Sequence, residues 1–472
     1  MAKIKVTESV DVDMEKIKKV YVIGIKGSGM VALVELLTSM GIEVTGSDTA
    51  EKFFTDEVLQ KIGVEYFENF SPGNITANID LVVYSTAYNE ENNVEFHEAK
   101  VRELPMVSYP EMLALLFNDK YGIAICGTHG KTTTSAMLAE VMKHVGSDPT
   151  AVVGSRVRQW GSNALVGKGE YFVLEADEFQ NKLKYYEPKA VVLTSIDYDH
   201  PDYYKNLSEY KQAFSGFVAK IPRAGFLAVW GDSADTNDVA CSCQCEIIKY
   251  GFMDDNDIKI THYELQMASG APTQTFGVKF LEKYLGSFEI QLVGKHNVLN
   301  ALAVISVCYK LGLDMEKVRE ALKNFQGTSR RFEIVGERNG AVLIDDYGHH
   351  PEEIKVTLKA AREIYPEKNI IAVFHPHSYS RTEALLHDFA QSFDDADQVI
   401  VLDIYGSARE TDGNVSSEDL VKLINKYNYG KAEYVPTIKE VVEFLEDKVG
   451  ENDIVLAIGA GNVNEVVEKL KR

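Results

Sequence analysis

The sequence YGIAICGTHGKTTT, residues 121–134, joins an apolar run to a glycine-bracketed turn that ends in Gly-Lys-Thr. A helical pattern follows from Ser135 to Val145, so the order strand, loop, helix is predicted. Backbone N–H groups of such a loop and the N-terminus of its helix can face phosphate groups. Lys131 would neutralise the phosphates, and the Thr132 hydroxyl would reach Mg²⁺. The stretch therefore predicts a site for a nucleotide triphosphate.

The loop is shorter than the common phosphate-loop pattern. That pattern has a glycine five residues before Gly130, where this chain has Ile125. What remains is Gly-x-x-Gly-Lys-Thr, and Gly-Lys-Thr alone also occurs in turns that bind nothing. The strand before the loop and the helix after it favour phosphate binding. The residues assigned to ATP in this loop are Gly127, Thr128, His129, Gly130, Lys131, Thr132 and Thr133.

Length and composition limit the fold and the class of partner. A chain of 472 residues is too long for one core and indicates about three domains. The formal net charge of −22 argues against nucleic acid as a partner, because phosphate backbones bind basic surfaces. No apolar run approaches the length of a membrane span, and the N-terminus lacks the apolar core of a signal peptide. We therefore expect a cytoplasmic protein with no membrane partner.

The five cysteines suggest no disulfide framework. Cys126 and Cys308 lie in apolar runs and are expected to pack as small hydrophobic side chains. The run CSCQC at 241–245 could suggest a metal site, but it lacks the paired Cys-x-x-Cys spacing of zinc sites. We expect reduced thiols.

Residues 19–48 predict a βαβ unit with a glycine turn at 24–30. Its layout resembles a dinucleotide-binding fingerprint, but the glycines give G-x-x-G-x-G instead of G-x-G-x-x-G. The loop still opens a helix N-terminus, so we expect it to bind a nucleotide or diphosphate. Asp48 fits a contact to ribose or base, with a helix cap as the alternative. The residues assigned to a UDP moiety are Gly27, Ser28, Gly29, Met30, Asp48, Ser85 and Thr86, the last two following a strand at 80–84.

Two further predicted strands place polar residues near the phosphate loop. The strand at 170–174 is followed by Glu175, and the strand at 190–196 leads to His200. Ligands of open α/β sheets bind at the carboxyl ends of strands, so the loop, Glu175 and His200 should converge. A carboxylate there suits Mg²⁺, whereas a histidine ligand is unusual for an ion that prefers oxygen. Residues 246–292 predict additional strands and turns.

From Gly327 onward, helices and strands alternate again, which predicts a mostly parallel sheet. The expected fold class is therefore α/β with three domains. A Rossmann-like N-terminal domain that binds UDP would span 1–117, and a central ATPase-like domain with the phosphate loop would span 118–326. A Rossmann-like C-terminal domain would span 327–472 and contribute to ATP and amino-acid binding.

In their order along the chain, these motifs resemble those of the Mur ligases, ATP-dependent enzymes that add amino acids to UDP-N-acetylmuramate, a cell-wall precursor. The resemblance covers nearly the whole chain. It rests on the phosphate loop and on EADE at 175–178, DH at 199–200, GKHN at 294–297 and DDYGHHP at 345–351. The first loop and FHPHSYSRT at 374–382 resemble the alanine-adding branch, with the branch that recycles murein tripeptide as the alternative.

The resemblance implies roles that spacing alone does not. ATP and Mg²⁺ are the expected cofactors, and UDP-N-acetylmuramate and an amino acid the expected substrates. The implied metal ligands are Thr132, Glu175 and His200. Further implied ATP contacts are His296, Asn297, Arg331 and Asp346. The implied catalytic residues are Lys131, Glu175, His200, His349 and Arg381. The resemblance also implies that four residues lie near the incoming amino acid and ATP: Tyr347, His349, His350 and Arg381. The alternative for His349 and His350 is a helix N-terminus with hydrogen-bonded imidazoles.

The chain departs from the family pattern at several positions. Lys26 replaces a glycine, Phe70 replaces a polar residue, and Phe179-Gln180 replaces Ser-Asp. Ser378 stands where alanine-adding members commonly carry Arg, which leaves the amino acid open. The preferred UDP-sugar and the choice between monomer and dimer also stay open.

Two other functions compete with a ligase. An oxidoreductase could use the first βαβ unit, but the glycine spacing and the second nucleotide loop argue against NAD(P)H. A nucleotide-gated interaction module would bind ATP and turn over no acceptor.

Overall fold

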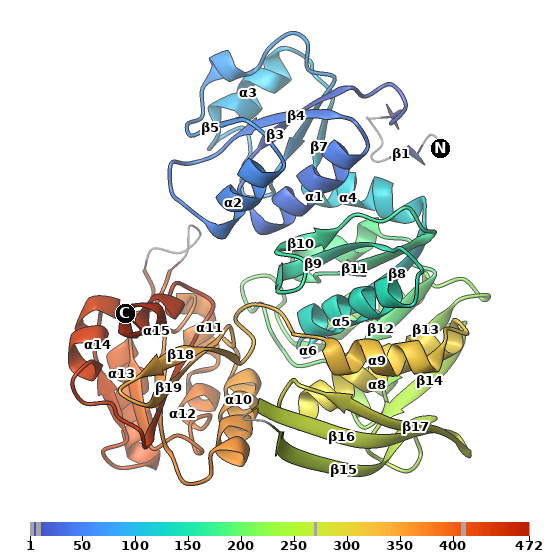
Figure 1. The fold of residues 1–472 in the computed structure, drawn as a ribbon. Helices are drawn as coiled ribbons and strands as arrows, with labels where there is room; N and C mark the ends of the chain where they lie inside the picture. The colour runs from blue at the N-terminus through green and yellow to red at the C-terminus, as the bar shows by residue number, and fades with distance from the viewer. Residues whose placement is uncertain (1–3, 6–10, 269–270, 407–411, 472) are drawn as a thin grey trace.

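The computed structural model describes residues 4–5, 11–268, 271–406 and 412–471. It contains three α/β units, each built on its own sheet of five, ten or six strands (Figure 1). The first unit lies above the middle unit, and the third unit lies beside the middle unit. The three-domain α/β fold is confirmed, while the proposed boundary residues stay a prediction. A short hairpin of β1 (Ile4–Lys5) and β2 (Asp11–Val12) precedes the first unit.

The first sheet is parallel throughout, in the order β5-β4-β3-β6-β7. Its strands are β3 (Lys19–Ile23), β4 (Glu43–Ser47), β5 (Tyr66–Phe67), β6 (Leu81–Tyr84) and β7 (Met106–Ser108). Its helices are α1 (Ser28–Ser39), α2 (Phe54–Lys61), η1 (Pro72–Asn74), α3 (Val94–Val101) and α4 (Tyr109–Asn118). Strand β3 lies between β4 and β6, so the strand order reverses at its carboxyl end. The glycine turn at 24–30 lies at this point, where ligands of such sheets bind.

The middle sheet has the order β10-β9-β11-β8-β12-β13-β14-β15-β16-β17. Its central strands are parallel: β8 (Tyr121–Cys126), β11 (Tyr171–Glu175), β12 (Ala190–Leu193), β13 (Phe226–Trp230) and β14 (Glu246–Gly251). One edge is the hairpin of β9 (Thr150–Val157) and β10 (Ser162–Leu165). The other edge is the meander of β15 (Ile258–Ala268), β16 (Ala271–Phe280) and β17 (Lys283–Ile290), where sequence predicted additional strands.

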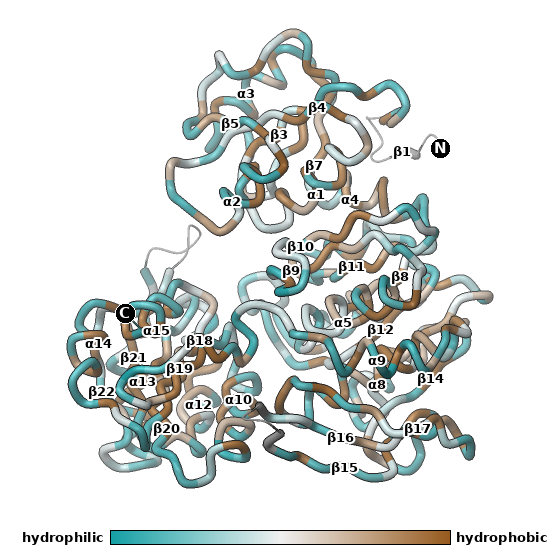
Figure 2. The backbone as a smooth tube through the Cα atoms, viewed as in Figure 1, coloured by the Kyte–Doolittle hydropathy of each residue, from teal (hydrophilic) through white to brown (hydrophobic). Residues whose placement is uncertain are grey.

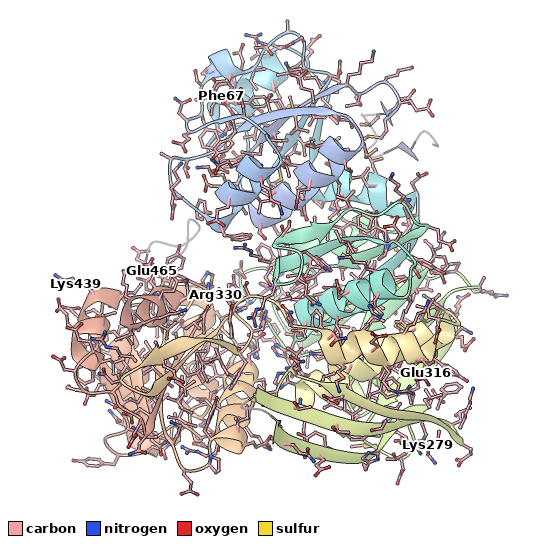
Figure 3. All side chains as sticks on the ribbon, in the orientation of Figure 1. Phe67, Lys279, Glu316, Arg330, Lys439 and Glu465 are labelled. Atoms are coloured by element: carbon pink, nitrogen blue, oxygen red, sulfur yellow. A yellow bond between two sulfur atoms is a disulfide. The ribbon has the colours of Figure 1, made fainter. Side chains whose placement is uncertain are left out.

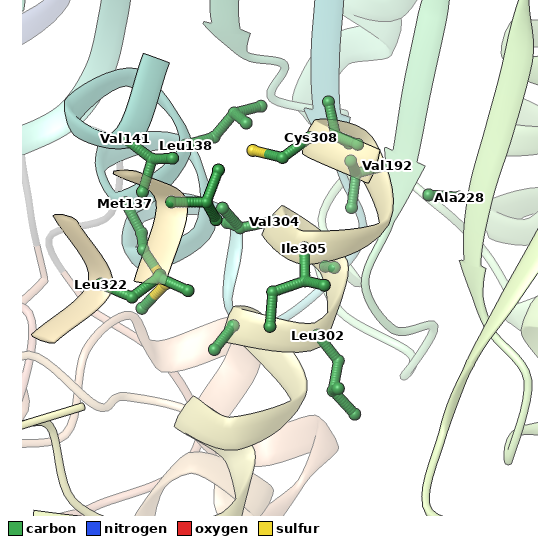
Figure 4. Packing of buried hydrophobic residues seen from close by; sticks show 14 of the residues in the cluster. Met137, Leu138, Val141, Val192, Ala228, Leu302, Val304, Ile305, Cys308 and Leu322 are labelled. Carbon is green, nitrogen blue, oxygen red and sulfur yellow. The ribbon is translucent and has the colours of Figure 1, made fainter. Parts of the chain in front are cut away.

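Helices cover both faces of the middle sheet. Alternate residues of β8 enter two different cores: Ile123 and Ile125 pack in one, Ala124 and Cys126 in the other. The first core is formed with α5 (Lys131–His144), α8 (Lys295–Lys310) and α9 (Met315–Asn324). The second is formed with α6 (Leu207–Val218), α7 (Ala234–Ala240) and part of η2 (Phe179–Tyr185). Figure 4 shows α5 packed on α8 through Met137, Val141, Val304 and Ile305. Burial on both faces explains why the strand before the phosphate loop is a continuous apolar run.

The third sheet has the order β18-β19-β23-β20-β21-β22. Its strands are β18 (Glu333–Arg338), β19 (Ala341–Asp346), β20 (Asn369–Phe374), β21 (Gln398–Val401), β22 (Ala432–Tyr434) and β23 (Asp453–Ile458). Its helices are α10 (Pro351–Ile364), α11 (Tyr379–Ala384), α12 (Leu386–Ala390), α13 (Ser417–Tyr427), α14 (Ile438–Leu445) and α15 (Asn464–Leu470). Only β18 is antiparallel to its neighbour, so the expected mostly parallel sheet is confirmed. In Figure 2 apolar stretches lie mainly in the interior of the units, whereas the outer loops are mostly polar.

The cysteines differ from the expectation. Cys243 and Cys245 form a disulfide, so the prediction of reduced thiols is wrong for this pair. Cys126 and Cys308 are buried in apolar cores, as predicted, and Cys241 is an exposed thiol. Within the described ranges, no helix combines the length and the apolar character needed to span a membrane.

Candidate active site

The phosphate loop lies between the carboxyl ends of β11 and β12. Glu175 is paired with Ile125, and Leu193 with Cys126, so both neighbouring strands end beside the loop. Gly130 has a φ of 79° and caps the N-terminus of α5. A Cβ there would lie 2.6 Å from Asn300 Oδ1, so both the backbone and the space require glycine. Gly127 also has positive φ, at 128°.

Lys131 folds back over its own loop. Its Nζ donates to the carbonyl oxygens of Gly127 and Thr128, the second at 3.0 Å, and lies 3.1 Å from Glu178 Oε2. Burial opposes the charge of this ammonium, but Glu178 and the neighbouring carboxylates outweigh burial and raise its pKa. Lys131 is therefore charged in the loop, and the phosphates of a bound triphosphate would replace Glu178 as its partner.

Thr132 and Glu175, two of the predicted metal ligands, lie side by side. Thr132 Oγ1 donates to Glu175 Oε1 at 2.7 Å. Glu175 Oε2 accepts the backbone N–H of Gly154 at 2.5 Å. Burial raises the pKa of Glu175, and these two hydrogen bonds oppose the rise.

The third predicted ligand, His200, lies among other acidic residues. Its Nε2 is 3.7 Å from Glu178 Oε1 and 3.8 Å from Asp199 Oδ2. His200 also has a φ of 55°, which is uncommon for a residue other than glycine and often marks a functional site. Among the described residues, one group has potential metal-ligand atoms all within 4.8 Å of one another: Asp177, Glu178 and His200.

The structure thus divides the three predicted metal ligands between two groups. Thr132 contacts Glu175, whereas His200 lies beside Asp177 and Glu178. Sequence reasoning chose Glu175 from the EADE run and missed the other two carboxylates as candidates. The carboxylate and hydroxyl oxygens fit a divalent cation such as Mg²⁺, and the imidazole of His200 is the unusual donor among them.

The start of α8 contributes the residues expected beside the adenine. His296 Nε2 lies 3.1 Å from Asn297 Nδ2, which donates to the carbonyl oxygen of Val293 at 2.7 Å. Burial lowers the pKa of His296 to about 4, so its ring is neutral at pH 7. One turn further, Asn300 Oδ1 accepts the hydroxyl of Thr134 at 3.1 Å. Helix α8 is therefore tied to the first turn of α5.

Two of the predicted ATP contacts come from the third unit. Asp346 is buried and accepts the N–H groups of Phe332 and Gly348, each at 2.8 Å. Burial raises its pKa, which the nearby Arg331 opposes. The guanidinium of Arg331 lies 3.7 Å from Glu353 Oε1.

Arg330 is labelled on the side of the third unit that faces the middle unit (Figure 3). Its Nε donates to Asp345 Oδ2 at 3.0 Å, and its Nη atoms donate to the carbonyl oxygens of Gly459 and Gly461. Burial raises the pKa of Asp345 to about 7, although Arg330 opposes the rise. Arg330 thus joins β19 to the loop after β23.

The loop residue His129 connects the middle and third units. Its Nε2 lies 3.3 Å from Asp197 Oδ2, and its Nδ1 lies 3.3 Å from Glu353 Oε1 on α10. Burial disfavours the imidazolium, but the two neighbouring carboxylates outweigh burial and raise the pKa of His129 to about 9. His129 is therefore protonated at pH 7, and its positive charge attracts Glu353 of the third unit to the loop.

A second connection is the buried pair Arg381 and Asp199. Arg381 Nε donates to Asp199 Oδ1 at 2.9 Å, and Nη2 donates to Oδ2 at 3.2 Å. The family resemblance implies that Arg381 lies near the incoming amino acid and ATP, and this stays a prediction. The structure places its guanidinium on the carboxylate that precedes His200.

His349 and His350 lie at the N-terminus of α10 with hydrogen-bonded imidazoles, and their place near the incoming amino acid stays a prediction. His350 is the N-cap of α10, and its Nδ1 accepts the N–H of Glu352 at 3.3 Å. His349 Nδ1 lies 3.1 Å from the carbonyl oxygen of Tyr347. Burial lowers the pKa of His349 to about 3, so its ring is neutral at pH 7.

In the first unit, most of the residues assigned to UDP surround the loop at 24–30. Asp48 Oδ2 accepts the N–H of Lys26 at 2.7 Å, and Ser85 N donates to the carbonyl oxygen of Ile23. Thr86 follows in the turn after β6. Met30 is buried in the core of this unit, which leaves its backbone rather than its side chain for a ligand.

The first loop also contacts the middle unit. Ser28 Oγ donates to the carbonyl oxygen of Gly154 at 3.1 Å, and Asn163 Nδ2 donates to the carbonyl oxygen of Ser28 at 2.9 Å. Gly154 in turn donates its N–H to Glu175. A single residue of β9, Gly154, therefore links the loop of the first unit to a predicted metal ligand.

Comparison with known proteins places all three units in one family. The profile of the Mur ligase family, catalytic domain, matches residues 19–121. The profile of the Mur ligase middle domain matches 125–308, and that of the Mur ligase, glutamate ligase domain, matches 330–461. The chain is 41% identical over 453 residues to UDP-N-acetylmuramate–L-alanine ligase of Desulfitobacterium hafniense (strain Y51), covering 96% of this chain and 99% of that protein.

A second relative with that name, from Caldanaerobacter subterraneus, is 41% identical over 97% of this chain and 98% of its own length. Among solved structures, UDP-N-acetylmuramate-alanine ligase MurC from Thermotoga maritima is similar with a TM-score of 0.79 at 27% identity, covering 96% of this chain and 98% of that one. A murein peptide ligase from Psychrobacter arcticus has the same fold, with a TM-score of 0.70 at 23% identity over 96% of this chain and 98% of its own. The chain belongs to the Mur ligase family.

Proposed function

We propose that this protein is an ATP-dependent ligase that joins UDP-N-acetylmuramate to L-alanine in the synthesis of peptidoglycan precursors. The observation that carries the proposal is the phosphate loop, in which Lys131 and Thr132 face the carboxylates of Glu178 and Glu175. A glycine loop with a lysine, a hydroxyl and adjacent acidic residues is suited to bind ATP with a divalent cation. The relatives at 41% identity, named for this reaction, support the choice of substrates.

A carboxylate does not condense with an amine in water without activation. In the proposed path, a carboxylate oxygen attacks the γ-phosphorus of ATP, an O–P bond forms, and ADP leaves. The amine then attacks the carbonyl carbon of this acyl phosphate, loses a proton, and phosphate leaves with the former carboxylate oxygen. Phosphoryl transfer depends on positioning and on charge neutralisation, which we assign to Lys131.

Mg²⁺ fits the donors at this edge of the sheet. We propose Thr132, Glu175 and His200 as ligands, with Asp177 and Glu178 as further candidates because they lie beside His200. When bound, the ion would neutralise charge on the phosphate oxygens. The residues proposed to contact ATP outside the loop are His296, Asn297, Arg331 and Asp346.

Contacts between the middle and third units would protect the reaction. Glu353 reaches His129 in the loop, and Arg381 reaches Asp199 beside His200. Exclusion of water at this junction would prevent hydrolysis of the acyl phosphate. We propose that Arg381 acts by positioning Asp199 and His200, and that His349 lies near the incoming amino acid.

The UDP moiety would bind to the first unit. We propose the first turn of α1 for the diphosphate, because its N–H groups begin directly after the loop. Asp48, Ser85 and Thr86 would contact the uridine side of the pocket.

Addition of murein tripeptide is the second candidate, and Ser378 favours it. Ser378 replaces the arginine common in alanine-adding members, has a φ of 66°, and accepts the N–H of Arg381 on its Oγ. A competition assay with L-alanine and murein tripeptide, read by mass spectrometry, decides between the two.

The proposal is tested by phosphate release from ATP. Release should require UDP-N-acetylmuramate and the amino acid together. Lys131→Ala should lower kcat by at least ~100-fold, because it removes the main cation at the transferred phosphate. Lys143→Ala on the exposed side of the same helix is the control and should keep full activity. Release that needs no acceptor, or full activity of Lys131→Ala, would contradict the proposal.

A further inference from the structure

Lys26 is a buried lysine in the loop that opens α1. Its side chain is 1% exposed. Its Nζ donates to the carbonyl oxygens of Thr49 and Glu51, each at 2.9 Å. The ammonium also lies 3.1 Å from Asp56 Oδ1 and 3.6 Å from Glu68 Oε1.

The backbone of Lys26 binds the same region. Its N–H donates to Asp48 Oδ2 at 2.7 Å, and its carbonyl oxygen accepts the hydroxyl of Thr55 at 2.7 Å. The face of the Tyr66 ring lies 5.1 Å from the ammonium. Both ends of Lys26 therefore hold one segment, residues 48–56, which we name the β4–α2 segment.

The β4–α2 segment follows the carboxyl end of β4, where the N–H of Asp48 donates to the carbonyl oxygen of Phe67 at 2.9 Å. Beyond that point the segment is at the surface, and Glu51, Lys52 and Phe53 are exposed. A buried ammonium is stable only when its charge is paired and its donors are bonded, so these contacts are strongly favoured over an open segment. A glycine at this position could make none of the side-chain contacts.

Asp48 is the residue of this segment that we assign to the UDP moiety. Its Oδ2 accepts the Lys26 N–H, and its Oδ1 accepts the N–H of Thr49 at 2.8 Å. The orientation of this carboxylate thus depends on a segment that the Lys26 side chain fixes. A segment already ordered before binding loses less conformational entropy when ligand arrives.

We propose that Lys26 is a positioning residue for the UDP-sugar: it holds the β4–α2 segment in the conformation that binds the uridine diphosphate. The inference rests on the proposed function, since it takes the first unit as the UDP site. Lys26 itself touches no reacting atom, and it should affect the binding of the UDP-sugar only.

The test compares Lys26→Met with wild type as full-length proteins. Methionine keeps an unbranched apolar stem and removes the ammonium. We expect the Kd for UDP, measured by calorimetry, and the KM for UDP-N-acetylmuramate to rise about tenfold. We expect kcat and the KM for ATP to stay within about twofold, because the phosphate loop belongs to another unit.

Lys52→Met is the matched control. Lys52 also lies near Asp56 and Glu68, but its side chain is 67% exposed. Its removal should therefore change neither the Kd for UDP nor the KM for UDP-N-acetylmuramate. Equal effects of the two substitutions would overturn the inference, and so would a loss in Lys26→Met that is spread over kcat and all KM values.

The outcome for wild type separates the two claims. If the wild-type protein binds no UDP, the proposed function is overturned. If wild type and Lys26→Met bind UDP equally well, only the inference is overturned.

If Lys26→Met does not fold, Thr55→Val removes the hydrogen bond to the Lys26 carbonyl at nearly constant shape. It should raise the KM for UDP-N-acetylmuramate about threefold and leave that for ATP unchanged; an unchanged KM overturns the inference.

Discussion

His129 lies between the two glycines of the phosphate loop and contacts carboxylates from two units. Sequence alone identified it as a loop residue. It did not identify Asp197 or Glu353 as partners, because Glu353 is 224 residues away. The same limit applies to Lys131, whose contact with Glu178 depends on how β11 ends beside β8. Residue types at the site were thus predictable, and their pairing was not.

Protonation of His129 should stabilise the protein at neutral pH. Its pKa is about 9 in the folded protein, compared with an ordinary value of 6.5. A raised histidine pKa stabilises the folded state fully below about pH 6.5, and this contribution is lost as the pH rises through about 9. The Tm of wild type should therefore fall more between pH 6.5 and 9 than that of His129→Gln.

The control for this comparison is His97→Gln, because His97 is exposed on the first unit. Its Tm should follow the wild-type curve across the same range. If the Tm of wild type and the Tm of His129→Gln change equally with pH, the imidazolium contributes nothing to stability.

At the scale of elements, most helices and central strands follow from apolar periodicity and from glycine turns. The strand before the phosphate loop and the strand before Glu175 are two examples. The β9–β10 hairpin was not predicted as a link between units, since its contacts with Ser28 arise only from packing of the first unit. The order of ten strands in one sheet likewise depends on long-range pairing that local patterns do not encode.

The hairpin should fix the position of Glu175. A Cβ on Gly154 would lie 2.6 Å from Glu175 Oε1, so Gly154→Ala must displace this carboxylate. A displacement of about 1 Å at a catalytic group can lower the rate about 100-fold, and we expect kcat to fall by at least ~10-fold with Tm nearly unchanged. Steady-state kinetics over a range of Mg²⁺ concentrations measures the effect.

Gly216→Ala provides the matched control. Gly216 lies in α6 with nothing within 4 Å of an added Cβ, so the substitution should preserve kcat. If Gly154→Ala retains full activity at every Mg²⁺ concentration, the hairpin does not position Glu175.

For the whole molecule, the arrangement of the three units could not be predicted from sequence. The Asp199–Arg381 pair joins residues 182 positions apart, and neither motif indicates the other as its partner. Family resemblance gave the number and order of units, but the contacts at their junctions follow from tertiary structure. The same reason explains why sequence does not predict the contact of Arg381 with Asp199.

Arg381→Met should weaken the junction between the middle and third units. Asp199 and Arg381 are 5% and 6% exposed, so the substitution leaves a buried carboxylate without its partner. Such a loss costs about 3–5 kcal/mol in the free energy of unfolding, which urea denaturation measures. The double variant Asp199→Leu/Arg381→Met should recover part of the lost free energy of unfolding, because no unpaired charge remains.

Lys310→Met removes an ion pair with Glu246 that is largely exposed, and serves as control. Lys310→Met should lower the free energy of unfolding by less than about 1 kcal/mol. An Arg381→Met protein as stable as Lys310→Met would mean that the Asp199 pair does not hold the two units together.

The central claim is that ATP activates the carboxylate of UDP-N-acetylmuramate beside Lys131, and isotope transfer tests it most directly. The substrate is labelled with ¹⁸O in its carboxylate, incubated with ATP and the amino acid, and the released phosphate is examined by mass spectrometry. We predict that each phosphate carries one carboxylate oxygen, because the C–O bond breaks when the amide forms. Amide formation with unlabelled phosphate would contradict the account.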